Sequence, residues 1–211
     1  MSNFLDFHRK YYHPSNSYIY LYGNMDMEEK LAFLDEHYLS HFDYLDVDSV
    51  IQEQKAFGAC RDVTLEYPVA ENEGEEDNTY LSYNMVVGNA ADSQMAMAFE
   101  VLDYALLSAP GAPLKQALLD VKAGKDVYGS YDDGILQPYF TVIAKGSNPD
   151  RKEEFVSVIR QVLGDIVKNG IDKKAVEAGI NYFEFRYREA DFSSYPKGLM
   201  YSLDILGRLA V

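Results

Sequence analysis

Residues 126–146 contain two strand-like runs separated by a tight turn. The runs "DVYGSY" and "ILQPYFTVIAKG" are rich in aromatic and β-branched residues, and "DDG" lies between them. Asp-Gly turns have the backbone twist that a hairpin requires, so this segment predicts two antiparallel strands. Pro138 has no backbone N–H to donate, which predicts an edge strand or a bulge at that position.

Three further runs have the composition of strands. "VTLEYPV" at 63–69 and "TYLSYNMVVG" at 79–88 are joined by the charged stretch 70–78, which predicts a second hairpin. "SYIYLYG" at 17–23 is dense in Tyr and Ile and predicts a strand near the start of the chain.

Helices are predicted between and after these runs, because apolar residues recur there at spacings of three and four. Capping residues or prolines mark where five of them begin: Asp26, Asp92, Pro113, Pro149 and Asp172. Gly124 is expected to end the third of these helices in the left-handed conformation, and Gly170 to end the fourth. A last amphipathic helix is expected around Leu199 to Leu206.

The predicted element order is β-α-ββ-αα-ββ-ααα. Hairpins separated by pairs of helices predict an α+β fold with a mostly antiparallel sheet covered on one face by helices. Residues 1–16 read as the end of a linking helix and an entry turn, followed by a single α+β domain over 17–211. Neither terminus has a helix cap, so we expect the chain to be excised from a larger multi-domain protein.

Charge and composition exclude several classes of function. The chain has 34 acidic and 19 basic residues, a net charge of -15 that would repel a nucleic acid backbone. No run approaches the ~18 apolar residues of a membrane span. Cys60 is the single cysteine, so no internal disulfide forms. These features predict a cytoplasmic protein, or one of an organelle matrix if a targeting segment has been removed.

His37 and His41 lie four residues apart, the spacing at which two imidazoles on one helix can share a zinc ion. A catalytic zinc helix also carries a glutamate between its histidines, whereas this segment has Tyr, Leu and Ser at 38–40. The pair also flanks an apolar helix stripe, so a structural role is expected. We therefore assign no metal site and no catalytic residue, and keep a metalloenzyme using this pair as an alternative.

Several short strings carry a resemblance to a known family. "FHRKYYHPSNSYIYLYGNMD" near the start, "SAPGAPLKQALLD" in the middle and "YPKGL" near the end together span nearly all of the chain. They resemble the second, non-catalytic domain of the N-terminal half of pitrilysin/insulinase-type zinc metallopeptidases, in the presequence-protease branch.

The resemblance implies a parent protein of four similar α+β domains, paired into halves that close around a peptide chamber. It places zinc in the catalytic first domain, whose His-x-x-Glu-His motif is not found in this sequence. In the last domain of such enzymes an Arg and a Tyr help to polarise the scissile carbonyl, and "VKAGKDVYG" puts Lys122 and Tyr128 at those places. Lys lacks the planar fork of Arg, so both read as relics of the fold.

The expected function is that of a non-catalytic structural domain that helps to form the substrate chamber of a zinc-dependent, peptide-degrading metalloendopeptidase. The expected partners are the catalytic domain of the same polypeptide and the peptide substrates of the parent, and a homodimer of the fragment is possible. No cofactor is expected in this chain, which alone is predicted to be inactive. A stand-alone binding or assembly module with the same fold is the alternative.

Overall fold

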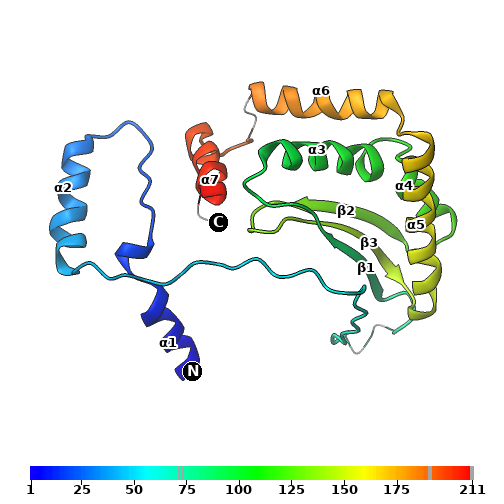
Figure 1. The fold of residues 1–211 in the computed structure, drawn as a ribbon, viewed down its shortest axis with the longest axis horizontal. Coiled ribbons are helices and arrows are strands. Elements are labelled where there is room, and N and C mark those ends of the chain that lie inside the picture. The colour runs from blue at the N-terminus through cyan, green and yellow to red at the C-terminus, as the bar shows by residue number, and fades with distance from the viewer. Residues whose placement is uncertain (71, 73, 190–191, 210–211) are drawn as a thin grey trace. The chain divides into compact units, whose positions relative to one another are not determined.

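The structure, a computed structural model, describes all residues except 71, 73, 190–191 and 210–211 (Figure 1). The chain forms two compact units. The first consists of Met1–Gln52 together with Phe192–Val211, and the second is Glu53–Asp191. These boundaries differ from the single domain over 17–211 expected from the sequence, and that assignment stays a prediction.

The first unit is helical in its described residues. Its elements are α1 (Ser2–Tyr11), the 3-10 turn η1 (Pro14–Asn16), α2 (Met27–His37), the 3-10 turn η2 (Leu39–His41) and α7 (Lys197–Leu209). Asp26 caps α2 as predicted, because its Oδ1 accepts a hydrogen bond of 3.1 Å from the backbone N–H of Glu29.

The strand predicted at 17–23 is not formed, which corrects the predicted element order. A strand is stabilised by a neighbour that pairs with its backbone N–H and C=O groups, and no strand lies among the described residues of this unit. Tyr18, Ile19 and Tyr22 of this segment are exposed.

The second unit contains the sheet. Its elements are β1 (Thr79–Val86), α3 (Ser93–Asp103), the π-helical turn η3 (Tyr104–Ser108), α4 (Pro113–Asp120), β2 (Asp126–Asp132), β3 (Tyr139–Ser147), the 3-10 turn η4 (Pro149–Arg151), α5 (Lys152–Asn169) and α6 (Lys173–Glu189). The described sheet has three antiparallel strands in the order β1-β3-β2.

The β2–β3 hairpin is confirmed, and Asp132 Oδ1 accepts a hydrogen bond of 3.0 Å from the N–H of Gly134 in its turn. Pro138 does not create an edge, because it lies just before β3, the central strand. Its carbonyl oxygen accepts a hydrogen bond of 2.8 Å from the N–H of Val87, so the missing donor falls outside the ladder. The predicted edge or bulge at Pro138 is therefore wrong.

The second predicted hairpin is only half formed. β1 pairs with β3, whereas residues 63–69 form no strand in the described structure. Pro68 removes one donor from this segment, and Val63 and Leu65 are exposed. The Tyr67 hydroxyl donates to the carbonyl oxygen of Asn78, a side-chain contact in place of a backbone ladder.

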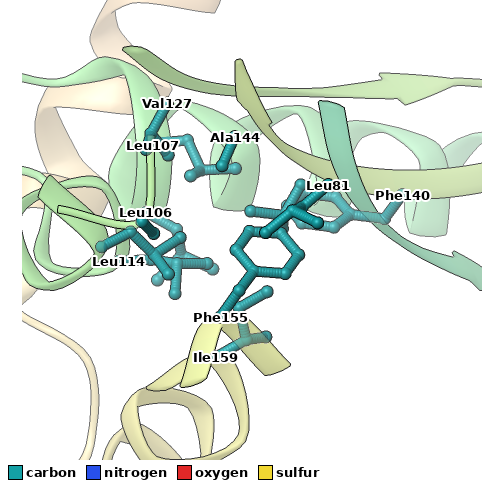
Figure 2. Packing of buried hydrophobic residues seen from close by; sticks show 12 residues of the cluster. Leu81, Leu106, Leu107, Leu114, Val127, Phe140, Ala144, Phe155 and Ile159 are labelled. Atoms are coloured by element: carbon teal, nitrogen blue, oxygen red, sulfur yellow. The ribbon is translucent and has the colours of Figure 1, made fainter. Parts of the chain in front are cut away.

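Helices cover one face of the sheet (Figure 1). Phe155 and Ile159 of α5 point from the helical layer toward Leu81 and Phe140 of the sheet (Figure 2), and the first pair is at most 1% exposed. Burial of such large apolar side chains is the main favourable term in folding. The predicted class, α+β with a mostly antiparallel sheet covered on one face, is confirmed.

Candidate functional site

The face of the sheet turned away from the core is the candidate site, and we name it the open sheet face. Strand residues alternate between faces, and Leu81, Val127 and Val142 mark the core side. The open sheet face is formed by the alternate residues Tyr80, Ser82, Asn84 and Val86 of β1, Tyr139, Thr141, Ile143 and Lys145 of β3, and Asp126, Tyr128, Ser130 and Asp132 of β2.

Polar side chains at the centre of this face bond to one another. The Thr141 hydroxyl donates to Asn84 Oδ1 at 2.6 Å, and the Ser82 hydroxyl donates to the same oxygen at 3.0 Å. Thr141 is 5% exposed, so this bond satisfies a polar group that burial would otherwise penalise. The network fixes the rotamers at the middle of the face.

Tyrosines and carboxylates lie toward the β2 side. The Tyr139 hydroxyl donates to Asp132 Oδ2 at 3.1 Å. This hydrogen bond, together with repulsion between a phenolate and the Asp132 carboxylate, raises the pKa of Tyr139 above its usual value of 10. Tyr139 therefore stays a neutral hydrogen-bonding group at physiological pH.

A cleft of about 320 Å³ opens at one end of the face, where β1 and β2 begin and β3 ends. We name it the lysine cleft; it is lined by Asp77, Asn78, Tyr80, Lys125, Asp126, Lys145 and Gly146. The Asp77 carboxylate accepts a hydrogen bond of 2.8 Å from Asn148 Nδ2 and lies 3.3 Å from Lys125 Nζ. The Asn148 bond, followed by the contact with Lys125, lowers the pKa of Asp77.

The side chains on the open sheet face can form hydrogen bonds and ion pairs with a ligand. This face offers hydroxyl, amide, ammonium and carboxylate groups, but all four histidines of the chain lie within residues 1–52. A nucleophilic or general-base mechanism requires an activated pair within hydrogen-bonding reach. Tyr128, which is 38% exposed, lies on this face opposite Ile143.

Lys122 lies at the C-terminal end of α4 and adopts the left-handed conformation, with φ of 53°. The N–H of the next residue, Ala123, donates a hydrogen bond of 2.9 Å to the carbonyl oxygen of Leu118, and this bond closes the helix end. The prediction that Gly124 takes this conformation is therefore wrong, since the helix ends earlier than the glycine suggested. This geometry gives Lys122 a role in the fold.

His37 and His41 do not share one helical face. α2 ends at His37, Tyr38 leaves helical geometry with φ of -138°, and His41 belongs to the separate turn η2. The His37 ring packs 4.7 Å from Phe33. The four-residue spacing predicts a shared face only within a continuous helix, and the helix break removes that condition.

The zinc implied by the resemblance needs at least three protein ligands. Within the described residues, no group of three or more His, Cys, Asp or Glu side chains is arranged to hold a metal ion.

The lysine cleft was missed by the sequence analysis, although a signal for it exists. The "DDG" turn fixes the register of the hairpin, and that register places Asp126 opposite Lys145. Lys125 precedes this pair by one residue, so the clustering of two lysines follows from the turn.

Comparisons with known proteins give a consistent result. A family described as "Peptidase M16 inactive domain" matches residues 2–183. The chain is 47% identical over 203 residues to Protein HypA of Clostridium perfringens, covering 96% of this chain and 21% of that protein. It is 32% identical to Presequence protease 1, chloroplastic/mitochondrial, of Arabidopsis thaliana, covering 97% of this chain and 19% of that protein.

A further relative is the mitochondrial presequence protease of Xenopus laevis, which is 26% identical over 193 residues and 89% of this chain. The chain spans 19% to 21% of the length of these three relatives. The crystal structure of the inactive peptidase domain of a zinc protease from Bordetella parapertussis superposes with a TM-score of 0.50 at 13% identity, covering 62% of this chain and 76% of that one. That likeness supports the fold.

Among the described helices, none has the length and apolar character needed to cross a membrane.

The family match extends over most of the chain, and the crystal structure shares its architecture. The chain belongs to the peptidase M16 family, and within it to the inactive domain.

Proposed function

We propose that the chain is a non-catalytic domain of a zinc-dependent metalloendopeptidase and that its open sheet face lines the chamber in which peptides are held. The observation that carries this proposal is the sheet face opposite the helices (Figure 1), on whose outer strands polar side chains such as Tyr80 and Tyr128 are exposed. The proposal is supported by relatives that are named presequence proteases.

In this proposal the partner of the chain is a catalytic domain of the same polypeptide, which supplies the zinc. The net charge of -15 favours basic, unstructured peptides through long-range attraction, which raises the rate of encounter. The chain itself contributes surface and charge. We place the parent in the cytoplasm or in an organelle matrix.

Photo-crosslinking tests which face meets the peptide. A Tyr128→p-benzoylphenylalanine variant puts the crosslinker on the open sheet face, and a Phe185→p-benzoylphenylalanine variant puts it on α6. These positions are 38% and 65% exposed, so the control is the more accessible of the two. With an unstructured basic peptide we expect capture at Tyr128 well above capture at Phe185.

Equal capture at the two positions, or capture at Phe185 alone, would overturn the proposal. Circular dichroism of both variants checks that the fold is intact. Both substitutions replace an aromatic side chain that is at least partly exposed, so neither removes core packing.

A further inference from the structure

Two lysines are held side by side at the end of the open sheet face, although the chain as a whole is strongly acidic. The backbone N–H of Lys125 donates to the carbonyl oxygens of Lys145, at 2.8 Å, and Gly146, at 3.2 Å. These bonds tie the segment before β2 to the end of β3. The proximity of the two side chains is therefore set by the backbone of the sheet.

Gly146 provides the space for one of these lysines. Its φ of +68° is a conformation that glycine adopts readily. A Cβ atom at this position would lie 3.0 Å from each of the Cβ, Cγ and Cδ atoms of Lys125. The missing side chain thus lets the Lys125 stem lie against the end of β3.

The charges of the cleft leave one ammonium group available. Lys125 Nζ lies 3.3 Å from Asp77, and Lys115 Nζ lies 3.6 Å from Asp126. Lys145 Nζ instead lies 5.9 Å from the centroid of the Tyr80 ring and makes no ion pair among the described residues. The carboxylates of the cleft are engaged by other lysines, and Lys145 keeps its three donors for a ligand.

We propose that the lysine cleft is a carboxylate-binding subsite for a peptide lying on the open sheet face, with Lys145 as the donor to the carboxylate and the Tyr80 ring as an apolar wall. This inference rests on the proposed function, since it assigns an anchor within the same peptide-binding surface. The carboxylate comes from an Asp or Glu side chain or from the C-terminus of the peptide. In this acidic protein, the cleft binds the one acidic group of an otherwise basic peptide. That contact fixes the position of the peptide along the open sheet face.

Fluorescence anisotropy with the full chain tests the subsite. The probe is an unstructured basic peptide with one Glu, an amidated C-terminus and a neutral fluorophore, compared with its Glu→Gln version. A third peptide carries Gln and a free C-terminus. Lys145→Gln removes the donor, and Lys174→Gln, near the start of α6, makes the same charge change on the helical layer.

For the wild type we expect one of the two carboxylate-bearing peptides to bind about two- to fivefold more tightly than the amidated Gln peptide, as is typical of an exposed ion pair. The preferred peptide identifies the source of the carboxylate. Lys145→Gln should abolish this preference, and Lys174→Gln should retain it.

Equal binding of all three peptides by the wild type would overturn the subsite and leave the proposed function standing. The subsite is likewise overturned if Lys145→Gln and Lys174→Gln lose the preference equally, because the effect would then be one of net charge. Absence of binding by every peptide would overturn the proposed function together with the subsite.

Discussion

Gly129 of β2 sets how closely the helical layer approaches the sheet. A Cβ at this position would lie 2.5 Å from the carbonyl oxygen of Thr141 and would also overlap the side chain of Leu107 in η3. Leu107 is one of the largest fully packed residues, at 2% exposure. The close fit of the π-helical turn on β2 therefore depends on a residue without a side chain.

We predict that Gly129→Ala lowers the free energy of unfolding by about 1–3 kcal/mol, the usual cost of overpacking a core. Urea denaturation followed by circular dichroism measures this change. Gly164→Ala is the matched control, because nothing lies within 4 Å of its added Cβ in the middle of α5. In that helix the Gly164→Ala substitution should raise the free energy of unfolding by about 0.5–1 kcal/mol, because alanine favours the helix more than glycine does. Equal effects of the two variants would refute the steric argument.

Asp103 is a carboxyl group in an unfavourable position at the end of α3. Its Oδ1 is buried and has no hydrogen-bond partner in the described structure. Desolvation raises the pKa of Asp103, and the Ser108 hydroxyl offsets part of this effect. Ionisation of Asp103 is thus disfavoured in the folded state.

The raised pKa of Asp103 makes the stability of the fold depend on pH. Because the folded-state pKa is raised, the folded state holds its proton more tightly than the unfolded state, whose pKa is about 3.9. The contribution of Asp103 to the free energy of unfolding is therefore fully present below about pH 3.9 and is lost as the pH rises through the pKa of the folded state. We predict that Asp103→Asn removes this loss, so that the variant gains stability relative to the wild type between acidic and neutral pH. Thermal unfolding of both proteins across that range is the measurement, and parallel curves would contradict the assignment.

At the scale of elements, the end of α4 places a lysine in a conformation that normally favours glycine. Lys122 has φ of 53°, and its backbone N–H donates a hydrogen bond of 2.9 Å to the carbonyl oxygen of Leu119. The backbone of Lys122 therefore takes part in closing the end of α4.

We predict that Lys122→Gly raises the free energy of unfolding by up to about 1 kcal/mol, because glycine adopts the left-handed conformation without strain. The same variant should bind an unstructured peptide as the wild type does. A folded Lys122→Gly variant with weakened peptide binding would show that this lysine acts in the site after all.

Local signals predicted the elements that depend on neighbouring residues. The cap at Asp92 is confirmed by a hydrogen bond of 2.9 Å from the N–H of Met95, and the "DDG" turn forms the β2–β3 hairpin. The strands predicted at 17–23 and 63–69 failed because a strand also requires a paired edge, which composition does not encode. Lys145 was missed for a related reason, since its role depends on cross-strand register.

At the scale of the whole molecule, the two units differ in the chemistry of their side chains. The first contains His37, His41 and the other two histidines, whereas the second contains the sheet with its open face and the lysine cleft. A hydrolase needs a general base or metal beside a peptide-binding surface. The helix break after His37 separates His37 from His41, so the two histidines do not share one helical face.

The most direct test is hydrolysis of an unstructured basic peptide by the purified chain, followed by mass spectrometry with and without added zinc. We predict that the peptide stays intact in both conditions. Zinc-dependent cleavage that disappears in a His37→Ala, His41→Ala double variant would contradict it.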